Sequence, residues 1–398
     1  MTTHYTRTRF TWFAYLSLAY FGLLTTIISA LIPFLRQDYD LTFTLGSLHL
    51  TLSATGTVII GLTGHRVLRA WGRRAAVWGG AAGMALGATL IALSLNVVTS
   101  LAGSFALGIS AALLMITFQA ALSDYYGPLR GAALAESSGV ASMATIVAPF
   151  WVGTAVSLGL GWRGATLAAA ALLVPLALAF WQTPVPRATP APRADGTPHL
   201  RLPGAFWMYA FVQFLVVSVE WGIIAWGATY LAQSGGLAAA EGVRWMSVFF
   251  AAMVVGRFCG RWIAERVQGV RQMYLQLAVA AVGFLLFWLA PSLPLRLVGL
   301  FVVGLGISNL YPFVVALADG VADGQTDLAM TRLALIGGFG ILLTPLVLGW
   351  AADRLDLQQA LGIIGLLLVA SVVATAVAGA LGRRHAAARL ATTERLAA

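Results

Sequence analysis

Two carboxylates stand inside long apolar stretches of this sequence, where a charge is unexpected. Glu220 lies near the middle of an apolar run over residues 204–232. Tyr209, Gln213, Glu220 and Gly227 follow one another at spacings of 4, 7 and 7 residues, which places them on one face of a helix. A carboxylate among apolar neighbours is costly, so it usually has a partner or a function. We predict that this face lines a cavity where Glu220 binds a proton or a cationic or hydroxylated ligand; a structural acid bonded to a neighbouring helix is the alternative.

Two further groups are candidates for carrying a proton. Glu136 stands in the first third of the apolar run 131–157, after Arg130 and beside two serines. We favour a structural role for Glu136, as the partner of an arginine in a gate motif, over titration. His49 has a side chain that titrates near neutral pH, which suits a proton relay. A lone histidine is more often a packed residue, and we hold that alternative open.

Neutral polar and aromatic residues could complete a binding site. Gln119 and Asn309, like Gln213, are amides in apolar runs, and each could bind substrate hydroxyls or hold two helices together. Trp226 and Tyr311 could stack on a sugar face or on an aromatic compound. Anchoring at a membrane interface is the alternative for Trp226.

Metal, cofactor and phosphate-loop chemistry have little support in the sequence. The five histidines are scattered, without the spacing of metal ligands, so we expect no metal or cofactor. The chain has no lysine, which makes a Walker-type phosphate loop impossible. Asp319, Asp323 and Asp327 form an acidic cluster at spacings of 4 and 4, which we interpret as a solvated loop before a helix.

The composition excludes a soluble protein. Of the 398 residues, 60% are hydrophobic and 10% are charged, against about 25% charged residues in a typical soluble domain. An ordinary cytosolic enzyme, a nucleic-acid-binding protein and a disordered chain are therefore excluded. The net charge of +10 comes with 24 basic residues that are all arginine.

Polar breaks divide the chain into twelve apolar runs, each long enough to cross a bilayer as a helix. Runs of this length without strict alternation exclude a β-barrel. The polar N-terminus lacks a cleavage pattern and leads into the first run, which we interpret as a membrane span rather than a signal peptide. The runs cover residues 10–34, 44–64, 75–95, 100–122, 131–157, 163–182, 204–232, 245–263, 272–290, 296–318, 332–352 and 358–381.

A proline-rich segment separates six runs from six. We predict an N-terminal six-helix bundle over residues 1–182, a cytoplasmic linker over 183–203, and a C-terminal six-helix bundle with a short basic tail over 204–398. The halves echo one another: LGIS recurs at 107–110 and 305–308, Pro149 and Gly153 match Pro345 and Gly349, and Gly72 matches Gly269. Such parallel repeats imply a pseudo-two-fold axis along the membrane normal and a site between the halves.

The distribution of arginine predicts the orientation. With the N-terminus inside and alternating sides, nineteen of the 24 arginines fall on the inner side and five on the outer side. This bias predicts that both termini are cytoplasmic. The five outer arginines are Arg36, Arg163, Arg244, Arg296 and Arg354.

Two loops at equivalent places carry similar motifs, and on these the chain resembles the major facilitator superfamily of transporters. The first loop runs from Gly64 to Arg74 and the second from Gly260 to Arg271. Both resemble the superfamily's cytoplasmic gate motif, which implies the gate residues Gly64, Arg69, Gly72, Arg73, Gly260, Glu265 and Arg266. The second loop keeps an acid–arginine pair, whereas Arg69 stands in the first loop where the motif usually has aspartate.

Within that superfamily the chain is most similar to the fucose–galactose–proton symporters and related sugar permeases. The similar segments are Glu220 with Trp226 and Tyr230-Leu231, the pair Gly256-Arg257, Gly304-Leu-Gly306, and the pair Tyr311-Pro312. The resemblance implies proton-coupled sugar transport. The chain lacks membrane carboxylates in its first and fourth runs, where those symporters carry the coupling acids, so that coupling scheme does not transfer directly.

These features predict a secondary active transporter of twelve helices that moves a small organic solute, sugar-like by preference, across the inner membrane by alternating access. Its predicted partners are the substrate, membrane lipids and, as an option, a proton, and we expect a monomer that binds no nucleic acid. Efflux of lipophilic or cationic drugs is the main alternative. A polytopic membrane enzyme is less favoured, because clustered catalytic groups are missing.

Overall fold

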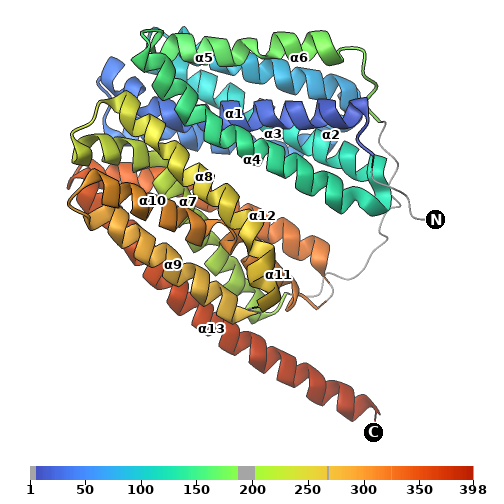
Figure 1. Cartoon of the computed structure of the whole chain (residues 1–398). Helices are drawn as coiled ribbons and strands as arrows, with labels where there is room; N and C mark the ends of the chain where they lie inside the picture. Colours follow the sequence, from blue (N-terminus) through green and yellow to red (C-terminus); the bar gives the residue numbers. More distant parts are fainter. Residues whose placement is uncertain (1–5, 187–201, 267–268, 324, 398) are drawn as a thin grey trace. The chain divides into compact units, whose positions relative to one another are not determined.

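All regular elements that the structure describes are helices, as the apolar runs require. The computed structural model describes residues 6–186, 202–266, 269–323 and 325–397 (Figure 1). Its helices are α1 (Arg9–Asp38), α2 (Phe43–Ala92), α3 (Val97–Tyr126), a 3-10 turn (Gly127–Leu129), α4 (Arg130–Ser157), α5 (Gly161–Ala171), α6 (Leu173–Phe180), α7 (Gly204–Gly235), α8 (Ala239–Arg266), α9 (Val270–Leu289), α10 (Leu293–Ile307), α11 (Leu310–Asp319), α12 (Thr326–Ala352) and α13 (Leu357–Ala397).

The helices confirm the predicted all-α membrane fold. Eleven segments of the described chain are long and apolar enough to cross a membrane, and the longest, Val97–Ser157, contains both α3 and α4. The long helix α2 contains two of the predicted runs, whereas α5 with α6 and α10 with α11 each divide one run into two helices. Each of the twelve apolar runs therefore corresponds to one passage of the chain.

Contacts group the chain into two compact units. Unit 1 is 1–192 together with 225–250, and unit 2 is 193–224 together with 251–398. The second part of α7 and the first part of α8 thus pack with α1–α6. Ser247 donates a hydrogen bond to the carbonyl of Ile146 on α4 at 2.9 Å. The division into halves at residues 183–203 remains a prediction, and residues 187–201 of that linker lie outside the described residues.

Glycine and proline shape the helices at matching places of the two repeats. Gly72 has φ +75°, which turns α2 between its two runs, and its repeat mate Gly269 has φ +63° just before α9. A side chain at either position would be strained. Pro149 lies inside α4 and Pro345 inside α12, and each removes a backbone donor from its helix.

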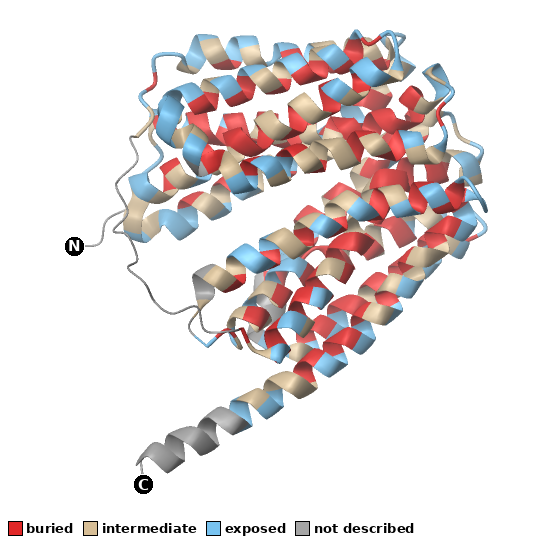
Figure 2. Ribbon diagram, turned by 180° about the vertical axis from the view of Figure 1, so that it is seen from behind, coloured by how far each residue is buried: buried red, intermediate tan, exposed pale blue. Residues whose placement is uncertain are grey.

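Within each unit, the buried residues lie on helix faces that pack against other helices of the same unit (Figure 2). The helix α1 contributes buried residues along nearly its whole length, from Phe10 to Leu35. The exposed large side chains include Leu86, Leu178 and Leu366 within the helices, as expected for surfaces that face lipid.

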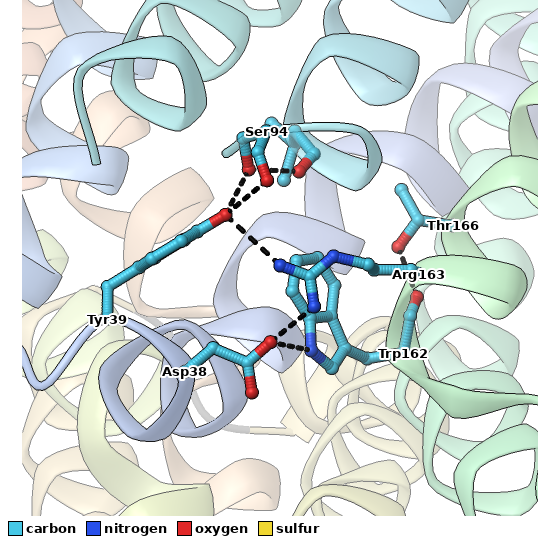
Figure 3. A network of polar contacts seen from close by, with 7 residues as sticks. Asp38, Tyr39, Ser94, Trp162, Arg163 and Thr166 are labelled. Atoms are coloured by element: carbon cyan, nitrogen blue, oxygen red, sulfur yellow. Dashed lines mark hydrogen bonds and ion pairs between the residues drawn. The ribbon is translucent and has the colours of Figure 1, made fainter. Parts of the chain in front are cut away.

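A polar network fastens one end of unit 1, away from the N-terminus (Figure 3). One oxygen of Asp38, at the end of α1, accepts hydrogen bonds from the Trp162 indole at 3.1 Å and from the Arg163 guanidinium. Arg163 also donates to the Tyr39 hydroxyl at 3.2 Å, and Tyr39 donates to the carbonyl of Ser94 at 2.7 Å. The ends of α1 and α2 and the start of α5 are therefore held together by side chains.

We predict that Asp38→Asn lowers the free energy of unfolding by about 1 kcal/mol, because the substitution keeps the shape but removes the charge from a partly exposed ion pair with Arg163. The measurement is thermal unfolding of the purified protein in detergent. Asp40→Asn is the matched control, since Asp40 lies in the same turn with a positive φ that asparagine also adopts. Equal unfolding temperatures for the two variants would contradict the prediction.

Candidate functional site

Unit 2 brings a carboxyl group, a guanidinium and a phenol together from three helices. Glu220 lies near the middle of α7 and is partly exposed. It interacts electrostatically with Arg257 of α8, and Tyr311 of α11 lies within electrostatic range of the same carboxylate. Arg257 and Tyr311 are exposed, with 46% of the tyrosine accessible. A molecule in contact with these groups can donate hydrogen bonds to the carboxylate, accept them from the guanidinium, and do either with the phenol.

A break between α10 and α11 positions Tyr311. Ser308 and Asn309 leave the helical hydrogen-bond pattern, and Pro312 lacks the N–H that would have bonded Ser308 in a continuous helix. The Asn309 amide donates to the carbonyl of Gly256 on α8 at 2.7 Å and to the Ser308 hydroxyl at 3.0 Å. The break is thus bonded directly to the residue before Arg257.

Two glycines on α8 make this contact close. A Cβ atom at Gly256 would collide with the Ser308 hydroxyl, and one at Gly260 would lie 2.6 Å from an oxygen of Asn309. Only glycine leaves room for the broken segment at these positions. Small residues four positions apart are typical of closely packed membrane helices. This spacing is the sequence signal that could have predicted the contact between α8 and the break before α11.

The structure assigns Asn309 to this helix contact. Asn309 is 6% exposed and its amide nitrogen is occupied, so it does not offer that nitrogen to a substrate in this conformation. These hydrogen bonds match the alternative role of holding two helices together, and substrate contact by Asn309 remains a prediction.

Trp226 and Gln213 are also enclosed. Trp226 has no exposed surface and packs edge-on against Phe43 in unit 1, with ring centroids 5.2 Å apart, so stacking on a substrate is excluded in this conformation. Gln213 is fully buried on α7, and neither polar atom of its amide has a hydrogen-bond partner. Gln119 of α3 is exposed on unit 1. Substrate contact by Gln119 and Gln213 therefore remains a prediction.

Glu136 pairs with an arginine that the sequence motifs did not indicate. The Arg7 guanidinium, just before α1, donates to both carboxylate oxygens at 2.9 and 2.7 Å. The Tyr15 hydroxyl donates to one of these oxygens at 2.9 Å. Glu136 was predicted to pair with a gate-motif arginine, and the observed arginine lies outside that motif. Because the two-point geometry is specific, Glu136 fixes the start of α1 against α4.

His49 is a packed residue. It has no exposed surface, and its ring nitrogens lie 2.9 Å from the Ser100 hydroxyl and 3.1 Å from the carbonyl of Gly46. Both ring nitrogens are thus occupied by protein groups. This arrangement corresponds to the structural alternative for His49, and proton carriage by His49 remains a prediction.

The arginines of the first loop motif have different surroundings, because one forms an ion pair and the other is exposed. Arg73 donates to Asp124 of α3 at 2.6 Å, with 9% of the arginine side chain exposed. Arg69, which replaces the usual aspartate, is exposed. Gly64 is buried, and a Cβ atom there would collide with Ile116. The motif therefore joins the start of the second run of α2 to the end of α3 through Arg73 and Asp124.

Three arginines, from the start of α1 and from the first loop, also hold the end of α6 and the residues after it. Arg9 donates to the carbonyl of Ala179 at 2.7 Å, and Arg74 donates to that of Trp181 at 2.6 Å. Arg73 donates to the carbonyl of Pro186 at 3.3 Å. The last carbonyls of a helix have no helical partner and carry partial negative charge, so cations stabilise them. The first loop thus fixes where the chain leaves the sixth span.

The second loop motif is only partly described. Gly260 packs against Asn309, and Arg266 is exposed at the end of α8. The backbone of Glu265 is helical, but its side chain lies outside the described residues, as do residues 267–268. The proposed gate role of Gly260, Glu265 and Arg266 remains a prediction.

Known proteins share both this fold and its sequence pattern. The pattern of the Major Facilitator Superfamily matches residues 14–325, which is most of the chain. The chain belongs to the Major Facilitator Superfamily. It is 27% identical over 371 residues to an uncharacterized MFS-type transporter of Yersinia pestis, covering 88% of this chain and 92% of the relative. It is 24% identical over 178 residues to the membrane protein MosC of Rhizobium meliloti, covering 45% and 43% of the two chains.

Solved transporter structures have the same fold as this superfamily member. A bacterial homologue of the human lysosomal transporter Spinster, in an inward-facing and unoccupied conformation, superposes with a TM-score of 0.79 at 16% identity over 95% of this chain and 98% of the other. The nucleoside transporter NupG superposes with a TM-score of 0.74 at 14% identity over 93% and 98%. At such identities the likeness establishes the fold alone.

Superfamily membership confirms the coarser predictions about the chain. It is a multi-pass membrane protein and a transporter of the superfamily. The resemblance to the sugar-permease branch is a finer statement and is taken up below as a proposal. Arg257, Arg7 and Arg9 are the side chains whose roles sequence reasoning missed, because their partners lie far away along the chain.

We predict that the double variant Arg73→Gln/Arg74→Gln is cut by trypsin after Arg187 several-fold faster than the parent protein. Trypsin cleaves after arginine, and the loss of both guanidinium groups releases the carbonyls of Trp181 and Pro186 just before that bond. The measurement is the cleavage rate after Arg187 in detergent, compared with cleavage after Arg193 in the same chain.

The matched control is Arg66→Gln/Arg69→Gln, which removes two exposed arginines from the same loop. Equal cleavage after Arg187 in both double variants would show that the arginines do not hold this segment.

Proposed function

We propose that this protein is a secondary active transporter that moves a small hydroxylated solute, sugar-like by preference, by alternating access. The observation that carries the proposal is the grouping of Glu220, Arg257 and Tyr311 from three helices of unit 2. An ionisable group in the membrane is expensive to keep there, and such groups usually mark a transport pathway. Superfamily membership supports a role in solute transport.

The chemistry of these three residues suits a neutral molecule with several hydroxyl groups. A carboxylate accepts hydrogen bonds, a guanidinium donates them, and a phenol does both. Adjacent hydroxyls of a sugar can satisfy all three groups at once. NupG is a nucleoside transporter, so a nucleoside, which also bears hydroxyls, is a second candidate within the same chemical class.

Efflux of lipophilic cations is less well supported. The positive charge of Arg257 acts on Glu220, and it opposes the binding of a cation to that carboxylate. Stacking of an aromatic cation on Trp226 is also excluded in this conformation, because the ring is fully buried. Efflux of a cation would need Arg257 to turn away from the site.

The remaining parts of the proposal concern orientation and coupling. The excess of arginine on the side of the termini supports an inner-membrane protein with both termini in the cytoplasm. We propose that it acts as a monomer and that a proton is its coupling ion. Glu220 is the preferred proton carrier, because Glu136 is engaged by Arg7 and Tyr15 and His49 by Ser100.

We predict that Glu220→Gln reduces solute uptake about tenfold or more, since it removes a charged hydrogen-bond acceptor that is worth about 1.5–3 kcal/mol. The measurement is uptake of labelled monosaccharides and nucleosides into proteoliposomes, with and without an inward proton gradient. The stimulation by the gradient is expected to disappear in the variant.

Glu241→Gln is the matched control, because Glu241 is a partly exposed acid at the start of α8 that forms a long ion pair with Arg244, at 3.9 Å. If both variants transport normally, Glu220 is not part of the site. Stabilisation of the protein by hydrophobic cations alone, in a thermal-shift screen against sugars and nucleosides, would refute the sugar-like substrate.

A further inference from the structure

The last helix is longer than a membrane requires. The helix α13 has 41 residues, from Leu357 to Ala397, which corresponds to a length of about 62 Å. A bilayer with its headgroups is about 40–45 Å thick. Figure 1 shows α13 continuing past the end of the neighbouring helix α9. Part of α13 must therefore lie beyond the hydrocarbon, at the side of the C-terminus.

The start of α13 marks one membrane boundary. Asp356 caps the helix by accepting a hydrogen bond from the backbone N–H of Gln359 at 2.7 Å. The Trp288 indole donates to the carbonyl of Gln358 at 2.8 Å, and Arg354 stacks on Trp350 with its guanidinium carbon 4.0 Å from the ring centroid. Tryptophan and arginine together are typical of the interface between hydrocarbon and headgroups.

Distance along the helix then places two arginines at the opposite headgroup layer. Arg383 follows Leu357 by 26 residues, and a helix of that length spans about 39 Å. Arg383 and Arg384 are both exposed. From this length we infer that the pair lies at the depth of the phosphates of the second leaflet. The sequence has two more arginines, Arg389 and Arg395, further along the chain.

Contacts with the rest of unit 2 keep this part of α13 in place. The His385 ring lies 2.9 Å from a carboxylate oxygen of Asp323, in the turn between α11 and α12. A Cβ atom at Gly382 would lie 3.7 Å from both the Tyr209 hydroxyl of α7 and Val321. Arg383 lies within electrostatic range of Tyr209 on α7, and both arginines keep exposed surface on this anchored part of α13.

We propose that Arg383 and Arg384 form a binding site for the phosphate of an anionic lipid headgroup in the leaflet at the C-terminal side. Guanidinium groups bind phosphate oxygens through two parallel hydrogen bonds, which makes arginine well suited to this ligand. The depth of the pair relative to the start of α13 favours a lipid over a soluble acidic protein. The inference rests on the membrane fold and does not depend on the transported substrate.

The test measures thermal unfolding of the full-length protein in lipid nanodiscs. Discs that contain phosphatidylglycerol are expected to raise the unfolding temperature of the parent protein above its value in phosphatidylcholine alone. Arg383→Gln/Arg384→Gln is expected to lose most of this rise, because each surface arginine strengthens attraction to anionic lipid about fivefold. Arg354→Gln, at the other end of the membrane span, is expected to keep the rise.

Three results would overturn the inference. In the first, the double variant keeps the full rise in unfolding temperature with phosphatidylglycerol. In the second, Arg354→Gln loses as much of that rise as the double variant does. The third is an equal rise in unfolding temperature when inorganic phosphate is added to phosphatidylcholine discs. If the double variant does not fold, Arg384→Gln alone is used, with native mass spectrometry to count bound phosphatidylglycerol. Unchanged lipid retention by that variant would likewise reject the site.

Discussion

The hydrocarbon of a bilayer offers no hydrogen bonds, and most features of this protein follow from that constraint. Every backbone group in a span needs a partner within the protein, so the chain forms helices and bends them only where other groups replace the lost bonds. The break at Ser308 and Asn309 shows how this is done. The freed segment is bonded to the carbonyl of Gly256 through the Asn309 amide, and it packs where Gly256 and Gly260 leave space.

The same constraint governs the charged side chains. Glu136 is engaged by Arg7, Asp124 by Arg73, and Asp38 by Arg163, so these three acids of unit 1 are each paired with an arginine. These pairs join helix ends to one another within unit 1. Glu220 differs from them, because it lies in the middle of its helix and keeps partial exposure beside Arg257. Keeping a charge in the middle of a membrane helix costs free energy, and a part in the proposed transport would account for its presence there.

The two repeats use the same physical devices at matching positions. Gly72 and Gly269 both adopt a positive φ before the third span of their half, and Pro149 and Pro345 both lie inside the fifth span. Their surroundings differ where function requires it. Ser110 of the first repeat lies in the unbroken helix α3, whereas Ser308 of the second begins the break that positions Tyr311. The helix break beside Tyr311 therefore has no counterpart at the matching place in α3.

The sequence by itself determined the all-helical membrane fold and the places of the apolar runs, because hydrophobic length is a local property. It also located Gly72 and the two loop motifs. The tertiary structure decided which side chains meet. It placed Arg7 against Glu136 across 129 residues and Arg257 beside Glu220, and it enclosed Trp226 and Asn309. Partners that are distant in sequence depend on how helices pack and face one another, and the order of residues along one helix does not specify that.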